Sequence, residues 1–359
     1  MIQHFIITAF SYRSNYKVKK KGLDPLHPER LEKRFGLFEV SCLSSLAHQE
    51  NQDFTWIIIV DPQLPDYYRD RLEQLISKRP SSHLYTYSRD ATLNNLDWLK
   101  PWINPRTHYI ITSKLDDDDA LFRGFTRYIS DHYNLLERNS NLPAMLFAGC
   151  REVVYWDFFP SKKAPLGYLK TIKHKAVKPS SAGFSVGCKY PELNYCILKF
   201  GHKSFTRLLT ENDNAVQKPS LKDRKTLKHR KEMLQAAKTS GIDWDGVLRD
   251  ENIHFLFTAT PQAMVINHLD NIQVQRMFKD ADVRTAVQSG RAFIGFDLNI
   301  EIAGKYISAN RKSLGLFMAM IRQYFLFTPD SFRNKSPLTI FSRKILGFKK
   351  IVSGFKKMH

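Results

Sequence analysis

Apolar and polar residues follow two different periods along the first 150 residues of the chain. Near-continuous apolar runs at 4–10, 54–61 and 107–115 predict strands that are buried on both faces of a parallel sheet. Apolar residues at helical spacing over 29–49 and 65–79 predict amphipathic helices. Strands that alternate with helices in this way indicate an α/β fold.

The hydrophobic pattern also predicts elements in the rest of the chain. The small-residue segment "PSSAGFSVG" (179–187) predicts a loop that leads into a strand. The further predicted elements are strands at 83–88, 144–156 and 261–271, a short helix near 98–103, and helices at 120–139 and within 298–327. In open α/β sheets, ligands bind at the carboxyl ends of the strands.

Four consecutive aspartates, Asp116 to Asp119, directly follow the predicted strand 107–115, and Asp61 closes the strand 54–61. Two carboxylates spaced across a turn can each give an oxygen to Mg²⁺ or Mn²⁺ while a diphosphate and water fill the other positions. The alternative is a solvated loop or a helix N-cap, where aspartate is also favoured. The position at a strand end favours the metal site.

The charge of the chain is strongly positive. Its 55 Lys and Arg against 35 Asp and Glu give a formal net charge of +20, which implies an anionic partner such as nucleic acid, a membrane surface or a phosphorylated substrate. Much of the excess lies in 218–231 and 342–359. No apolar run is long enough to span a membrane, and the first ten residues predict a strand and not a signal peptide. The scattered cysteines indicate buried thiols in a reducing compartment; they are Cys42, Cys150, Cys188 and Cys196.

The segment 342–359 has the pattern of a basic amphipathic helix that lies on a membrane surface. Six cations near an anionic leaflet contribute about 1 kcal/mol each. The alternative is a solvated, disordered tail. The apolar stripe is formed by Ile345, Phe348, Val352 and Phe355, and the cations are Arg343, Lys344, Lys349, Lys350, Lys356 and Lys357.

The stretches "HFIIT", "RFGLFEVSCLSSL", "FTWIIIVD" and "KLDDDDAL" occur in this order within residues 4–125. In this order they resemble the bacterial rhamnosyltransferase family of nucleotide-sugar glycosyltransferases. The resemblance implies a glycosyltransferase A-type fold, an α/β Rossmann-like mixed sheet flanked by helices, here with a helical, basic C-terminal extension. The expected organisation is a catalytic domain over 1–275 (nucleotide-binding half 1–125, acceptor half 126–275), a helical extension over 276–341 and a membrane-associating tail over 342–359.

The resemblance also implies a metal site. Asp116 and Asp118 resemble the DXD pair of such enzymes, and Asp119 extends it. His268 stands where a late histidine completes the metal site or contacts the diphosphate. Imidazole is a competent ligand at neutral pH, although a lone histidine after a strand is more often structural. The implied cofactor is Mn²⁺ or Mg²⁺.

Other residues are expected to bind the nucleotide-sugar. Asp61 resembles the acidic residue that accepts a hydrogen bond from a pyrimidine base, and its alternative role is to cap a helix before Pro62. Asp116, Lys114 and Gly183 are expected at the same site; Lys114 stands where the family more often has Arg. Gly183 lies in the small loop that would let the donor sugar approach the backbone, or in an ordinary turn.

An inverting enzyme also needs a general base for the acceptor hydroxyl. Asp245, beside Trp244, is the first candidate, and Asp213 is the second. A surface carboxylate is the alternative for each.

Together these features predict a metal-dependent hexosyl- or pentosyltransferase. The expected donor is a UDP- or dTDP-linked sugar, with rhamnose suggested by the family name alone, and the acceptor a surface polysaccharide or lipid-linked glycan. The protein is expected to bind the cytoplasmic face of the inner membrane through residues 342–359. Two other classes stay open: a nucleic-acid-binding protein or nuclease, which the lack of a nucleic-acid motif disfavours, and a non-catalytic membrane-peripheral scaffold.

Overall fold

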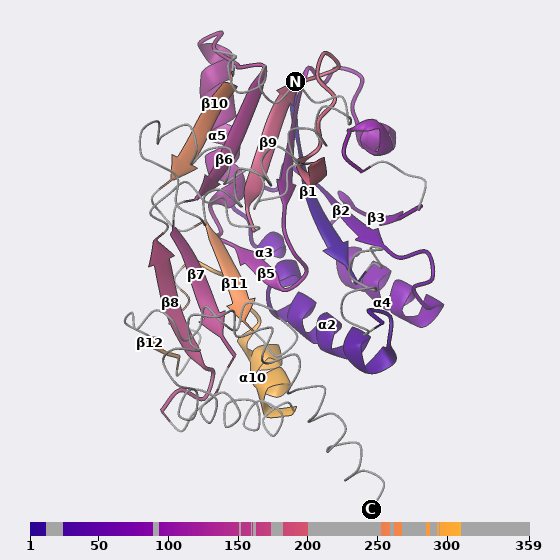
Figure 1. Ribbon diagram of the computed structural model, residues 1–359, viewed down its shortest axis with the longest axis vertical. Coiled ribbons are helices and arrows are strands. Elements are labelled where there is room, and N and C mark those ends of the chain that lie inside the picture. The colour runs from indigo at the N-terminus through magenta and orange to yellow at the C-terminus, as the bar shows by residue number, and fades with distance from the viewer. Residues whose placement is uncertain are drawn as a thin grey trace, which may run out of the picture.

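The protein is described from a computed structural model (Figure 1). The residues that it describes are 1–11, 24–88, 93–150, 152–158, 160, 163–173, 182–199, 253–258, 262–267, 285–287, 293 and 295–309.

The larger of two sheets has seven strands in the order β10-β6-β9-β4-β1-β2-β3. Strands β1 to β4 run parallel, whereas β9 runs antiparallel between β4 and β6. This mixed, Rossmann-like α/β sheet flanked by helices confirms the predicted fold class. The strands are β1 (Ile2–Phe10), β2 (Thr55–Val60), β3 (Ser82–Thr86), β4 (Tyr109–Lys114), β6 (Met145–Cys150), β9 (Phe184–Lys189) and β10 (Ile253–Thr258).

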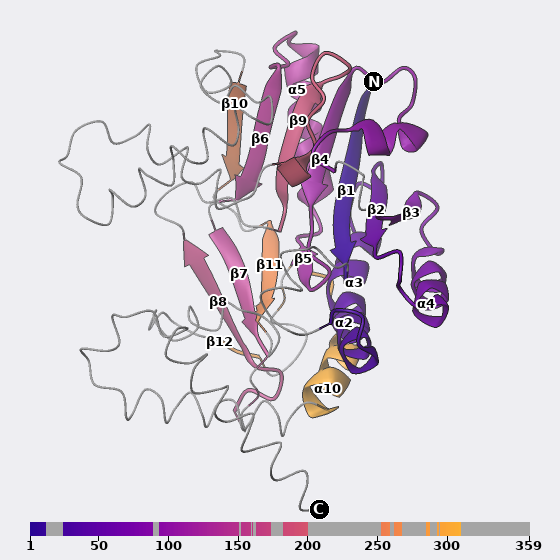
Figure 2. The ribbon, with the colours of Figure 1, turned by 45° about the vertical axis from the view of Figure 1, so that its right-hand side comes forward.

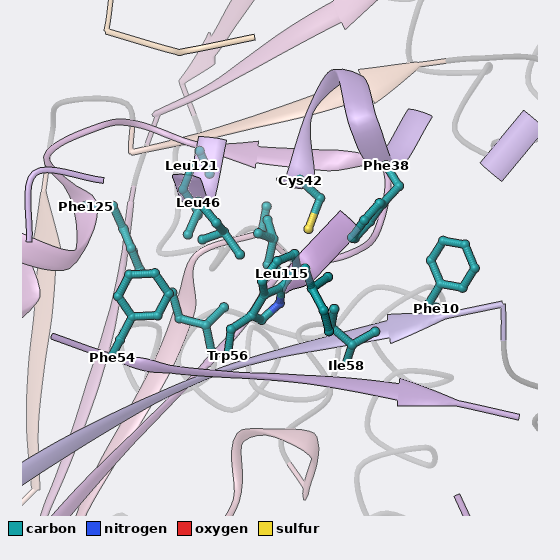
Figure 3. Close-up of a cluster of buried hydrophobic side chains, with 14 of the residues drawn as sticks. Phe10, Phe38, Cys42, Leu46, Phe54, Trp56, Ile58, Leu115, Leu121 and Phe125 are labelled. Carbon is teal, nitrogen blue, oxygen red and sulfur yellow. The ribbon is translucent and has the colours of Figure 1, made fainter. Parts of the chain in front are cut away.

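Neighbouring side chains of β1 point to opposite faces of this sheet, as the strand period requires. Ile6 and Phe10 enter a core under four helices, whereas Phe5 and Ile7 enter a core under two short 3₁₀ helices. Figure 3 shows the first core, where Phe38 and Cys42 lie over Trp56. The helices are α2 (Pro28–Val40), α3 (Cys42–Ala47), α4 (Asp66–Ile76) and α5 (Phe125–Arg138) on the first face, and η1 (Asp97–Trp102) and η2 (Ile197–Lys199) on the second.

A smaller sheet has the strand order β12-β8-β7-β11-β5 and lies below the larger one in Figure 2. A third core, which includes Trp156 and Ala303, joins it to α2 and to α10 (Ile300–Ala309). Its strands are β5 (Asp119–Leu121), β7 (Glu152–Asp157), β8 (Tyr168–Lys173), β11 (Ala263–Asn267) and β12 (Thr285–Ala286).

Three predicted elements differ from the observed ones in their bounds. The predicted helix 29–49 is two helices that meet at Ser41, whose hydroxyl donates to the Leu37 carbonyl at 2.8 Å. The predicted helix 120–139 is wrong at its start, because Asp119–Leu121 pairs with β11 and the helix begins at Phe125. The predicted strand 144–156 is two strands, β6 and β7, in different sheets.

Other sequence predictions have different outcomes. All four cysteines are buried and free, as predicted. Among the described residues no helix has the length and apolar character of a membrane span. The expected division into domains stays a prediction, because most of 276–359, including the basic tail, lies outside the described residues, although α10 is helical.

Candidate functional site

The candidate site lies at the carboxyl edge of the parallel strands. Strand β1 stands between β2 and β4, with Phe10 beside Val60 and Ile7 beside Lys114. Asp61 therefore leaves the sheet on one side of β1, and the four aspartates 116–119 leave it on the other. This shared edge is the ligand-binding edge of such sheets, as the sequence analysis expected.

The structure divides the four aspartates into two pairs. The side chains of Asp116 and Asp118 are 34% and 13% exposed. Asp117 and Asp119 are buried, at 2% and 3% of their full residue exposure. Successive side chains thus alternate between the sheet edge and the interior, and the accessible pair is the one that was expected to form the DXD motif.

Asp119 ties this loop to the smaller sheet. It pairs with Val265, and its Oδ1 accepts a hydrogen bond from the Ile266 amide at 3.3 Å. Burial raises the pKa of Asp119 well above its usual range, and the nearby charges of Asp118 and Asp116 raise it further. The loop thus joins the end of β4 in the larger sheet to β11 in the smaller one.

Two cationic side chains of the chain itself contact the aspartates. Lys114 Nζ lies 3.0 Å from Asp116 Oδ1. Arg34 donates from Nε to Asp117 Oδ2 at 2.9 Å, and its Nη2 pairs with the other oxygen of Asp117. Its third nitrogen, Nη1, donates to Asp118 Oδ2, also at 2.9 Å. One guanidinium therefore joins a buried and an accessible carboxylate.

The sequence analysis missed Arg34, although a signal for it exists. On α2 it lies beside the buried Leu31, Phe35 and Phe38, on the stripe that faces the core. A cation at such a position needs a buried partner, because an isolated charge is costly to desolvate. The sequence does not say where along the chain that partner lies.

Asp61 closes a turn and does not cap a helix, its expected alternative role, because α4 begins only at Asp66. It is buried, and its Oδ1 accepts a hydrogen bond from the Gln63 amide at 2.9 Å. This contact fixes the loop between β2 and α4. Recognition of a base by Asp61 stays a prediction.

Gly183 has a backbone requirement of its own. Its φ is +72°, a conformation that favours glycine, and its amide donates to the Lys114 carbonyl at 2.9 Å. An added Cβ would lie 3.2 Å from the Phe125 ring and 3.3 Å from Leu121. The glycine thus holds the start of β9 against the end of β4, and its expected approach to a donor sugar stays a prediction.

Three predicted residues, Asp213, Asp245 and His268, lie outside the described residues. The strand before His268 is described: β11 ends at Asn267, two residues after Val265, the partner of Asp119. The structure therefore places the strand that precedes His268 beside Asp119.

The donor set fits a hard divalent cation held in part by its substrate. Carboxylate oxygens are the ligands that Mg²⁺ and Mn²⁺ prefer, and Asp116 and Asp118 offer them at an accessible edge. In the described part of the chain no three His, Cys, Asp or Glu side chains are grouped as a complete metal site. The fit to such a cation thus rests on two described carboxylates, with the other positions left to substrate and water.

Comparison with solved structures finds distant likenesses. Residues 1–349 of S. aureus TarS in complex with UDP-GlcNAc are 11% identical, with 75% of this chain and 60% of that chain covered and a TM-score of 0.33. The 4-diphosphocytidyl-2C-methyl-D-erythritol synthase from Anaerococcus prevotii is 8% identical, with 76% and 94% covered and a TM-score of 0.29. The alignment thus spans about 60% of the TarS fragment, and these likenesses are too distant to decide function.

Comparison by sequence gives one clear result. No curated protein matches the chain. The model of the family described as "Putative rhamnosyl transferase" matches residues 24–221, more than half of the 359 residues. This match includes α2, the strand end with Asp61, the four aspartates and Gly183. The chain therefore belongs to this family.

Proposed function

We propose that the protein is a metal-dependent glycosyltransferase that moves a sugar from a nucleotide-sugar to a glycan or lipid-linked glycan acceptor. The observation that supports this most is the division of the four aspartates. Only Asp116 and Asp118 are accessible, at the edge where α/β sheets bind ligands. A merely solvated acidic loop would have no reason to bury two of its four charges.

Asp116 and Asp118 would hold Mn²⁺ or Mg²⁺, which when bound neutralises the charge of the departing nucleoside diphosphate. Lys114 adds a positive charge beside Asp116, at the end of the same strand. His268 would complete the proposed ligand set, because β11, which pairs with Asp119, ends one residue before it. Asp119, which was also expected as a ligand, is buried and would instead hold the loop against β11.

The remaining roles follow from the family. Asp61 would accept a hydrogen bond from a pyrimidine base, so the donor is a UDP- or dTDP-linked sugar. Asp245 or Asp213 would take the proton from the acceptor hydroxyl. The family description names rhamnose, and we adopt a rhamnosyl donor on that ground alone.

Thermal unfolding with UDP, dTDP, GDP and CMP, each with and without Mn²⁺, tests this function. A ligand at 100 times its Kd stabilises the fold by about 2.7 kcal/mol, which raises the melting temperature of a chain of this size by about 3 to 5 °C. We expect a manganese-dependent shift with UDP or dTDP that Asp118→Ala abolishes. Asp131→Ala is the matched control, because Asp131 is exposed on α5 and pairs with Arg127 at 3.5 Å. Equal shifts in wild type and Asp118→Ala would remove the aspartates from the site.

We further propose that residues 342–359 bind the anionic cytoplasmic face of the membrane, where a lipid-linked acceptor is found. The support is the sequence pattern of six cations around an apolar stripe. Deletion of 342–359 should move the protein from the membrane fraction to the supernatant at low salt, with little change in melting temperature. Unchanged fractionation would contradict this attachment.

A further inference from the structure

Arg34 was not among the predicted site residues, but its side chain contacts two of the four aspartates. It reaches them from α2, more than eighty residues earlier in the chain, and its side chain is 14% exposed. Two nitrogens of the guanidinium take both oxygens of Asp117, and the third takes one oxygen of Asp118. The two oxygens of Asp117 thus hold the guanidinium as a fork, which fixes its plane.

Both ends of this contact are anchored. The α2 backbone is held by the buried Leu31, Phe35 and Phe38, and Figure 3 shows Phe38 in the core beside Cys42. Asp117 is buried, so it cannot turn toward solvent without losing its partner. Nη1 of Arg34 therefore points in a fixed direction, and this direction sets the position of Asp118 Oδ2.

We propose that Arg34 is a positioning residue that orients Asp118 for the metal–diphosphate, an inference that rests on the proposed function. Groups that hydrogen-bond to a metal-ligating carboxylate typically change metal affinity 10- to 100-fold when they are removed. In this arrangement the buried carboxylate of Asp117 holds Arg34 in place, which is a structural role for the second aspartate of the run.

Charge alone predicts the opposite effect. A cation next to a metal ligand repels a second cation, so its removal should tighten Mn²⁺ binding if Arg34 is only a counter-ion. Lysine keeps the charge but cannot make the planar fork on Asp117. A counter-ion role therefore predicts tighter binding in Arg34→Gln and little change in Arg34→Lys. A positioning role predicts weaker binding in both.

The test is the Mn²⁺ affinity of the full chain, measured by the electron paramagnetic resonance signal of free Mn²⁺. The affinity is measured well below the melting temperature. The nucleotide present is UDP or dTDP, whichever raises the melting temperature of wild type more. We expect Arg34→Lys and Arg34→Gln to bind Mn²⁺ at least 10-fold more weakly than wild type. Lys33→Gln is the matched control, because Lys33 lies next on α2 and pairs with the exposed Glu29 at 3.0 Å. It should bind as wild type does.

Arg34→Gln also leaves the buried carboxylate of Asp117 without its cation. The measurement is therefore repeated with a double variant that combines Arg34→Gln with Asp117→Asn. This variant should regain the melting temperature but not the Mn²⁺ affinity. Unchanged or tighter binding in Arg34→Gln and the double variant, with Arg34→Lys unchanged, would overturn the positioning role and leave the proposed function intact. A wild type that binds no Mn²⁺ with either nucleotide would overturn both.

Discussion

His4 gives a pH-dependent stability that can be worked out from the structure. It lies in β1 and is buried, and its Nε2 is 2.7 Å from the Ser113 hydroxyl in β4. Ser113 in turn lies 2.5 Å from the Ser185 hydroxyl in β9. This chain of contacts joins the three strands next to the aspartate loop. Burial, together with the smaller effect of the positive charge of Arg79, lowers the pKa of His4 to about 3.

The sign of the effect follows from this lowered pKa. In the unfolded chain His4 takes up a proton near its usual pKa of 6.5, whereas in the folded chain it stays neutral until about pH 3. Its contribution to stability is therefore complete above pH 6.5 and is lost as the pH falls from 6.5 toward 3. At pH 5 this uptake favours the unfolded chain by about 2 kcal/mol, from roughly 1.5 pH units at 1.36 kcal/mol each.

Urea unfolding at pH 7.5 and pH 5 measures this loss in wild type and in His4→Gln. Glutamine can still hydrogen-bond to Ser113 but does not titrate, and the other titrating groups are the same in both proteins. We expect the free energy of unfolding of wild type to fall by about 2 kcal/mol more than that of the variant. Equal losses in the two proteins would show that His4 takes up its proton in the folded state and would refute this reasoning.

Two further substitutions test Asp61 at the site and the packing of β9 in the larger sheet. Asp61→Asn keeps an oxygen for the Gln63 amide but removes the carboxylate, so we expect about 10-fold weaker UDP binding by calorimetry, a loss of about 1.4 kcal/mol, with little change in melting temperature. Unchanged binding would leave Asp61 with its turn role alone. Gly187→Ala in β9 would place a Cβ against the Tyr133 hydroxyl and 2.7 Å from Tyr109 Cε1. We expect a loss of about 1–3 kcal/mol in urea unfolding, and an unchanged midpoint would mean that the tyrosines move aside at no cost.

The sequence by itself determined much of the larger sheet. Each of the runs 4–10, 54–61 and 107–115 is apolar over the length of one strand, and each forms one of the parallel strands of the larger sheet. The period of these runs is local, so it needs no knowledge of distant residues. The strand that leads into Asp116–Asp119 likewise placed these aspartates at the binding edge, because the carboxyl ends of parallel strands share one edge.

Only the tertiary structure decided what happens just after that strand. Asp119–Leu121 has apolar neighbours that suit a helix start, yet it pairs with a strand more than a hundred residues later. In the same way, 144–156 is predicted as one strand but contributes to two sheets. A strand partner is set by long-range packing, so a local pattern does not contain it.

The same reason explains the candidate site. Four identical aspartates in a row carry no periodic signal of their own, although the family resemblance singled out Asp116 and Asp118. The pairing with β11 and the reach of Arg34 from α2 decide which two face solvent and which two are buried. The sequence thus determined that a cluster of charge stands at the end of a buried strand. The fold decided how each charge is neutralised, because burial of a carboxylate requires a partner that only tertiary packing can supply.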